Sequence, residues 1–305
     1  MRLKPIAVLA GCLACGKESD DTLQQARDVR IAAPAPEADK LDLLTQEFTI
    51  APGDDKMYCE FIDYSDDDVA IRAFDSRQGE GGHHLLLLTT SNRRPNGTVE
   101  DCSDRAAMAD MRPLILPLDL PEGHAVRLTK GMQFVFQLHY VNTFTEPLLI
   151  RDVARLEKTP IDQVTHWVAP FATNDALFEV NPKAEGEKTF DCTVDAEGLE
   201  LILLGGHMHE NGTLFDVQIG PTTEQLTSLY YVDPWRAEFR DTPPITTLFD
   251  SPVPLPKGTV VRTSCKWKNA TDKKLEFPHE MCSTFGYLRG AQSPWICDTG
   301  GLGSR

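Results

Sequence analysis

Long apolar runs are missing from this chain: no stretch approaches the 18 or more apolar residues that a membrane-spanning helix requires. Helical periodicity is also rare along the 305 residues, which argues against a mainly helical fold. Positive charge is scarce, because 30 Lys and Arg face 46 Asp and Glu and leave a formal net charge of -16. A surface of that sign repels phosphates, so we expect no nucleic-acid partner.

The N-terminus has the features of an export signal over residues 1–15. Arg2 and Lys4 precede a short apolar run, and small residues follow it. Leu-Ala-Gly before Cys12, and the small residues before Cys15, resemble the lipobox of bacterial lipoproteins, in which the Cys is lipidated. Cys12 has the better local match and Cys15 the more usual signal length, so both stay open. We expect an exported lipoprotein of the cell envelope (periplasm or outer membrane), or a secreted protein, with membrane contact only through a lipid anchor.

Cysteine parity supports an oxidising compartment. Beyond the signal the chain has six cysteines, which allow up to three disulfides: Cys59, Cys102, Cys192, Cys265, Cys282 and Cys297. Exported proteins with an even cysteine count usually pair them. Lipidation of Cys15 would leave no spare thiol, whereas lipidation of Cys12 would leave Cys15 unpaired.

The composition and the pattern of apolar residues change after the first 45 residues. Residues 16–45 are rich in Asp, Glu, Ala and Pro, and this composition predicts a flexible linker. Short apolar runs then alternate with Gly, Pro, Asn and Asp. That pattern predicts an all-β protein of two tandem antiparallel β-sandwich domains, jelly-roll-like in character. A break near residues 157–163 divides them into an N-terminal domain, 46–158, and a C-terminal domain, 159–305.

Four of the eight histidines form two tight pairs, one in each predicted domain. Adjacent residues on a strand point to opposite faces, so His83 and His84 reach one metal only if the backbone bends. The preceding Gly81-Gly82 permits such a bend. His207-Met208-His209 needs no distortion, because residues i and i+2 of a strand share a face. Two such pairs, each after Gly-Gly, favour two metal sites.

A metal site usually has a third protein ligand. His139 lies in a strongly apolar run, where a bare imidazole would be costly, and it is the natural third ligand for the first pair. For the second pair the candidates are His279 and Met281, and composition does not choose between them, because Met usually fills cores. A set of two His and one Met would suit copper, since zinc and calcium rarely use a thioether.

The chain resembles the copper type II, ascorbate-dependent monooxygenases, the family of peptidylglycine α-hydroxylating monooxygenase and dopamine β-monooxygenase. Four motifs carry the resemblance in the family's order, across roughly residues 46–300: His83-His84 before an apolar run, Gln137-Leu138-His139-Tyr140, His207-Met208-His209 and Glu280-Met281-Cys282. The resemblance implies that the first centre, His83, His84 and His139, binds an electron-transfer copper. It implies that the second centre, His207, His209 and Met281, is catalytic and binds the copper at which O2 and substrate react.

The same resemblance implies disulfides Cys59–Cys102, Cys192–Cys297 and Cys265–Cys282, the last beside Met281. Two further disulfides of the animal enzymes have no counterpart here. The implied activity is hydroxylation of a C–H bond of a small organic substrate, with O2, two copper ions, and ascorbate or a similar reductant as co-substrate.

The substrate pocket departs from that of the peptide-processing relatives. They place a basic residue shortly before the His-x-His motif to bind a carboxylate, whereas residues 203–206 here read Leu-Leu-Gly-Gly. Ser283 and Phe285 also replace an amide and a Tyr of those enzymes. We therefore expect a more apolar pocket and a small aromatic or amine-bearing substrate, and a glycine-extended peptide is not favoured.

Two other functional hypotheses start from the same histidines. A non-catalytic copper-binding or copper-storage lipoprotein would need the same ligands, so the motifs do not exclude it. A zinc hydrolase is disfavoured, because the chain has no His-Glu-x-x-His motif. Among the remaining histidines, His124 is expected in an exposed turn, while His166 and His279 receive no assigned role.

Overall fold

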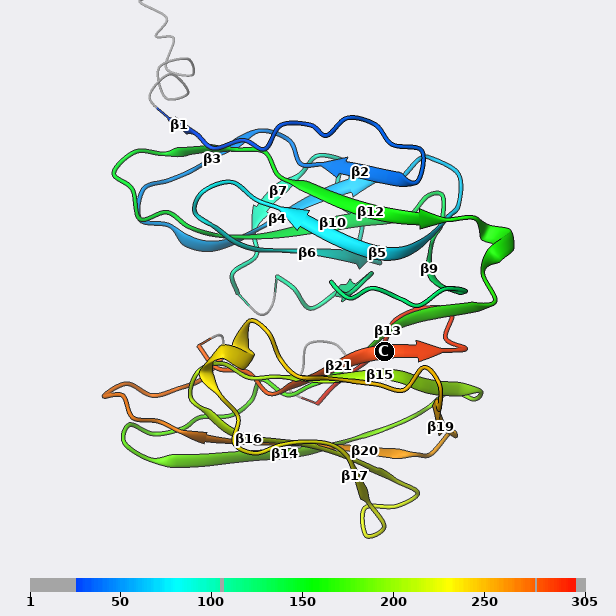
Figure 1. Cartoon of the computed structure of the whole chain (residues 1–305). Helices are drawn as coiled ribbons and strands as arrows, with labels where there is room; N and C mark the ends of the chain where they lie inside the picture. Colours follow the sequence, from blue (N-terminus) through cyan, green and yellow to red (C-terminus); the bar gives the residue numbers. More distant parts are fainter. Residues whose placement is uncertain (1–25, 105–106, 278, 300–305) are drawn as a thin grey trace, which may run out of the picture.

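Strands dominate the structure, a computed structural model that describes residues 26–104, 107–277 and 279–299 (Figure 1). The helices among the described residues are two short 3-10 turns, η1 (Ile161–Gln163) and η2 (Ala237–Arg240). None of them is long and apolar enough to cross a bilayer. Most strand pairs are antiparallel, so the predicted all-β fold of two tandem sandwiches is confirmed.

The N-terminal half contains a five-stranded sheet, β7-β4-β10-β6-β8, the sheet segment β9-β5-β12-β2 and a short sheet, β1-β11-β3. It forms the upper part of Figure 1, coloured blue to green. Its strands are β1 (Arg27–Asp28), β2 (Lys40–Leu44), β3 (Phe48–Ile50), β4 (Asp55–Asp63), β5 (Val69–Arg77), β6 (Gly82–Thr90), β7 (Val99–Asp101), β8 (Met111–Pro113), β9 (His124–Leu128), β10 (Gln133–Val141), β11 (Leu148–Ile150) and β12 (Val153–Thr159).

The C-terminal half pairs a four-stranded sheet, β14-β20-β16-β17, with the sheet segment β18-β15-β21-β13, to which β19 and β22 add at the edges. Its strands are β13 (His166–Asn174), β14 (Glu185–Thr193), β15 (Leu199–His207), β16 (Gly212–Gly220), β17 (Thr227–Val232), β18 (Ile245–Thr247), β19 (Val253–Leu255), β20 (Val260–Lys268), β21 (Ser283–Arg289) and β22 (Trp295–Asp298). β12 ends at Thr159, and the connection through η1 leads into this half.

One short parallel pairing joins the halves. β13 pairs with β9 through His166 with His124 and Trp167 with Ala125, which makes one ten-stranded sheet across the molecule. Apolar packing also crosses this junction, since Tyr287 of the C-terminal half belongs to the N-terminal core. The hydroxyl of Tyr287 accepts a hydrogen bond of 2.7 Å from the backbone N–H of Leu116.

The central strand β10 shows how the core positions a functional side chain. Phe134, Phe136 and Leu138 are fully buried in the sandwich core, as expected for alternate residues of one strand face. Val135 on the opposite face belongs to a smaller apolar cluster around the disulfide Cys59–Cys102. His139 shares the face of Val135, so it projects away from the sandwich core.

The structure corrects the prediction of a flexible linker at residues 16–45, as far as its described part is concerned. β1 pairs with β11, and β2 pairs with β12 along five residue pairs. Leu41 and Leu43 pack against the N-terminal core, and Arg155 holds Asp42 with two hydrogen bonds of 2.7 and 2.9 Å. Average composition did not predict these strands. A few leucines that pack against the core are enough to hold a strand when a sheet edge is available for pairing.

Candidate metal centres

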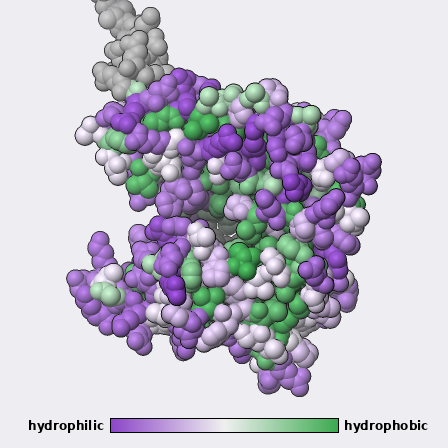
Figure 2. Space-filling view, in the orientation of Figure 1, coloured by the Kyte–Doolittle hydropathy of each residue, from purple (hydrophilic) through white to green (hydrophobic). Residues whose placement is uncertain are grey.

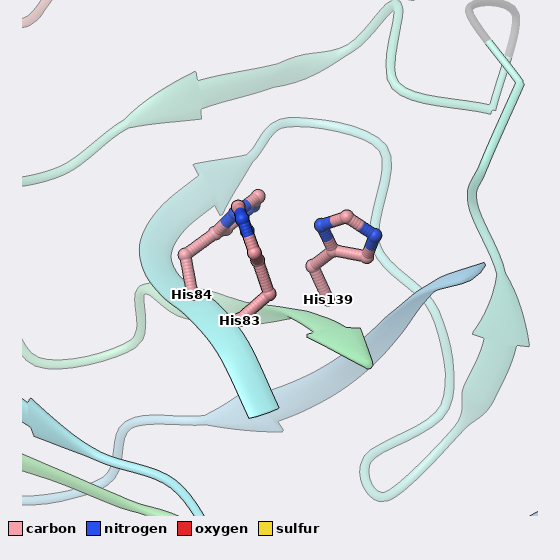
Figure 3. Close-up of side chains that lie close together, drawn as sticks. All are labelled: His83, His84 and His139. Carbon is pink, nitrogen blue, oxygen red and sulfur yellow. The ribbon is translucent and has the colours of Figure 1, made fainter. Parts of the chain in front are cut away.

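Three histidine rings gather between two neighbouring strands of the N-terminal half (Figure 3). His83 and His84 lie on β6, and His139 lies on β10. One nitrogen from each ring lies within 4.8 Å of the others, and the ring centroids are 4.8 to 5.4 Å apart. Metal–nitrogen bonds are about 2.0–2.1 Å long, so modest side-chain rotations would bring all three rings onto one ion.

A β-bulge turns the two adjacent histidines toward this site. β6 pairs His84 with His139 and Gly82 with Tyr140, so His83 is the extra residue. Glycine is needed before the bulge, because a Cβ at Gly82 would lie 2.4 Å from a side-chain carbon of Gln78. The bend that the Gly-Gly pair predicts is therefore present, and a β-bulge is the usual way to re-aim a strand residue.

Hydrogen bonds prepare these rings to act as ligands. Nε2 of His139 lies 2.8 Å from a carboxylate oxygen of Asp55, which can only accept, so Nε2 carries the proton and Nδ1 offers a lone pair. That Nδ1 is buried and has no hydrogen-bond partner. Burial is the main cause that lowers the pKa of His84 to about 4, and the nearby His139 ring is the second. The ring of His84 is therefore neutral near pH 7. An orphaned buried lone pair beside neutral imidazoles fits a bound metal ion.

The second histidine pair lies at the end of β15 in the C-terminal half. His207 is the last residue of the strand, and Met208 is fully buried in the C-terminal core. The rings of His207 and His209 have centroids 5.1 Å apart, so they share a face, as their spacing predicts. Burial is the main cause that lowers the pKa of His207 to about 3, and the neighbouring His209 ring is the second. This ring is therefore also neutral near pH 7.

The segment before β21 lies beside this pair. β15 and β21 pair so that His207 is opposite Ser283, two residues after Met281 in the chain. Nδ1 of His209 donates to the backbone carbonyl of His279 at 3.0 Å, which leaves Nε2 free for a ligand. The side chain of His279 is exposed. The backbone of His279 thus contacts His209 directly, and Met281 lies between Glu280 and the disulfide-bonded Cys282.

A buried carboxylate between them, Glu280, anchors the second centre. Its side chain is fully buried. It accepts hydrogen bonds from the backbone N–H groups of His209 at 2.9 Å and Asn211 at 2.8 Å, and from the indole of Trp267 at 3.1 Å. The Asn211 side chain adds a bond of 3.2 Å. The sequence motif contains Glu280 but gives no sign of burial, because two of its partners, His209 and Asn211, lie about 70 residues earlier.

The two centres lie within electrostatic reach of each other. After the larger effect of burial, His209 contributes to the lowered pKa of His84, and His84 contributes to that of His207. Figure 2 shows the surface hollowed between the two halves in this orientation. The first centre, in the N-terminal half, therefore lies near the second, in the C-terminal half.

A charged pair that the sequence did not reveal lies near both centres. Arg240, at the end of η2, binds Asp241 through hydrogen bonds of 3.0 and 3.1 Å. Both charges act on the pKa of His83 and on that of His207, although burial is the main cause in each case. Arg240 lies beyond the His-x-His motif in the chain, so no local pattern could connect it with the site.

Apolar groups cover the strand surface beside His207. Gly205 precedes it on the same face, and a Cβ at Gly205 would lie 2.5 Å from the ring of Phe285 and 2.8 Å from Ile245. Glycine at this position lets both side chains lie flat against the strand. Phe285 and Ile245 thus lie over Gly205, two residues before His207, and Arg240 and Asp241 add charge near His207.

The three expected disulfides are present: Cys59–Cys102, Cys192–Cys297 and Cys265–Cys282. The last two join the two sheets of the C-terminal sandwich, since Cys192 and Cys265 lie on β14 and β20 and their partners lie on β22 and just before β21. Cys265–Cys282 thereby ties the residue after Met281 to the core. Three disulfides support an oxidising, exported environment. The lipidation candidates Cys12 and Cys15 lie outside the described residues.

Comparison with known proteins identifies no relative by sequence: no family model matches the chain, and no curated protein matches it. Among solved structures, the major capsid protein P2 from bacteriophage PM2 aligns with 81% of this chain and 97% of its own, at 9% identity and a TM-score of 0.37. The structure of infectious bursal disease virus Gx strain aligns with 82% of this chain and 72% of its own, at 10% identity and a TM-score of 0.23. Scores this low carry no argument about function.

Proposed function

We propose that this protein is a copper-dependent monooxygenase that hydroxylates a C–H bond of a small organic substrate. The reaction consumes one O2, two electrons from a reductant such as ascorbate and two protons, and yields an alcohol and water. The observation that carries the proposal is the pairing of two unlike donor sets across one junction. One set has three imidazoles, and the other has two imidazoles, with the segment that contains Met281 bonded to His209 through His279 and Glu280.

The chain's own residues would hold the ions and keep their ligands neutral. His83, His84 and His139 would hold one copper, and His207, His209 and Met281 the other. Copper, when bound, would supply the one-electron transfers and oxygen activation that side chains alone do not perform. A soft thioether at the second centre favours the reduced ion. The unlike donor sets are what separate this proposal from simple metal binding.

Hydrogen bonds to oxygen atoms orient the rings of His139 and His209. Asp55 fixes the proton of His139 on Nε2, and the carbonyl of His279 fixes that of His209 on Nδ1. Each ring then presents its other nitrogen toward the site. The surroundings of His207 are partly apolar and partly charged. Phe285 and Ile245 give an apolar surface, and Asp241 with Arg240 supplies charge. A small aromatic or amine-bearing substrate fits these surroundings.

We further propose that the protein is a lipoprotein of the cell envelope, anchored through Cys15 or Cys12. The three disulfides support export, and the signal-like residues 1–15 suggest the anchor. Mass spectrometry of the protein purified from membranes would locate the lipid.

The test measures copper content together with ascorbate-dependent O2 uptake and product formation in a substrate screen. We expect two coppers at these centres and O2 uptake that rises with the correct substrate. Met281→Ile should retain the first-centre copper and lose hydroxylation, whereas Met132→Ile, which removes a thioether far from the motifs, should retain both. Full hydroxylation by Met281→Ile would overturn the assignment. Copper binding without ascorbate-dependent O2 consumption would instead indicate the copper-storage function.

A further inference from the structure

Two histidines outside both centres meet where the halves join. His124 begins β9 and His166 begins β13, and the two residues are directly paired in the short parallel ladder. Their ring centroids are 4.8 Å apart, the same separation as that of His83 and His139 in the first centre. His124 is expected from the sequence in an exposed turn. It is instead partly buried, with its ring against His166.

The hydrogen bonding of His124 matches that of a metal ligand. Nδ1 lies 3.3 Å from the carbonyl of Glu122, which can only accept, so Nδ1 carries the proton. Nε2 is buried and has no hydrogen-bond partner. Within the described ranges, two buried side-chain polar atoms lack a partner, and the other is Nδ1 of His139. Metal-binding histidines usually donate one ring N–H to an oxygen and offer the other nitrogen to the ion.

The second ring is held in place by backbone contacts. The N–H groups of His166 and Thr165 both donate to the carbonyl of Gly123 at 2.9 Å. These bonds fix the start of β13 against the turn that precedes β9. The nearby carboxylate of Glu200 is hydrogen-bonded to Arg289 at 2.6 Å, so it is already engaged. Among the described residues no third His, Cys, Asp or Glu completes a cluster with these rings, so the two imidazoles are the candidate ligands.

We propose that His124 and His166 form a third metal site, which binds a late first-row transition-metal ion through one nitrogen of each ring. Imidazole suits copper and zinc. Cu(I) accepts two nitrogen ligands alone, and Zn(II) would complete its shell with water. The site does not depend on the proposed oxygenase activity, because it shares no ligand with the other centres. An ion here would link β9 to β13 and thereby stabilise the junction of the halves.

The experiment counts metal equivalents in the full chain with its disulfides formed. Cu(I) is titrated without oxygen against a chromophoric chelator, and Zn(II) is titrated separately. His166→Gln should bind one equivalent fewer than the wild type for at least one of the two ions. Asp162→Asn is the control, because it removes an exposed possible ligand of η1, four residues before His166, and should leave the count unchanged.

A spectroscopic measurement keeps the proposal testable if His166→Gln fails to fold. Cu(I) and Zn(II) are diamagnetic, so ring 15N signals of the wild type can be followed during each titration. The bound nitrogens of His124 and His166 should shift together with one equivalent of ion. Unshifted signals with both ions, or an equal metal count in a folded His166→Gln protein, would overturn the proposal. These outcomes are independent of whether O2 is consumed, so failure of the proposed function remains distinguishable.

Discussion

Replacing Glu280 by Gln should damage the second centre while leaving the first intact. The carboxylate is fully buried and accepts hydrogen bonds from the backbone of His209 and Asn211 and from the Trp267 indole. An amide keeps the shape but has only one acceptor oxygen, and its NH2 group would face N–H donors. Because one of these donors belongs to His209, the substitution loosens a proposed copper ligand directly.

The expected loss of stability follows from the count of bonds. Each oxygen of Glu280 accepts at least two hydrogen bonds, so the amide can satisfy about half of the present donors. Leaving a buried donor unsatisfied costs about 1–3 kcal/mol, which for two donors makes roughly 2–6 kcal/mol. This is a large share of a typical unfolding free energy of about 5–15 kcal/mol. At about 2–4 °C per kcal/mol, the melting temperature should fall by roughly 5–20 °C.

The assay combines thermal unfolding with Cu(I) affinity at each centre, measured by chelator competition. We expect Glu280→Gln to weaken the second centre and to leave the first unchanged. Glu276→Gln is the matched control: this exposed carboxylate pairs with Lys274 at 3.2 Å, and its loss should cost less than about 1 kcal/mol. An unchanged melting temperature would refute the anchoring role, and an equal loss of affinity at both centres would show general destabilisation instead.

Three further predictions concern other parts of the molecule. Asp55→Asn should weaken Cu(I) binding at the first centre by about 10–100-fold in chelator competition, because the carboxylate orients His139. Burial raises the pKa of Glu60 to about 7, from 4.5 in the unfolded chain. The folded protein therefore holds this proton more tightly than the unfolded chain, and it loses stability as the pH rises from 4.5 through 7. Glu60→Gln should therefore raise the melting temperature at pH 8 and change it little at pH 4; equal values at pH 8 would contradict this. Removing Cys265–Cys282 by double Ser substitution should cost about 3 kcal/mol in denaturant unfolding and weaken the second centre alone.

Local patterns were sufficient for the fold class and for part of the site. Short apolar runs between turn residues predicted an all-β protein, because strand formation depends on alternation that is readable within a few residues. The shared face of His207 and His209 followed from their spacing, and the bend at His83-His84 followed from Gly81-Gly82. Composition was a weaker guide: it assigned residues 16–45 to a linker, although β1 and β2 lie there.

Only the tertiary structure decided which distant residues meet. His139 reaches His84 because of the register between β10 and β6, and Glu280 reaches His209 because β21 lies beside β15. The register between strands that are distant in the sequence depends on which residues of both strands are buried, so the residues around His139 or Glu280 alone do not determine it. The same reason applies to the two histidines at the junction. Their sequence surroundings predicted an exposed turn for His124 and no role for His166, and the pairing of β9 with β13 brings the two rings together.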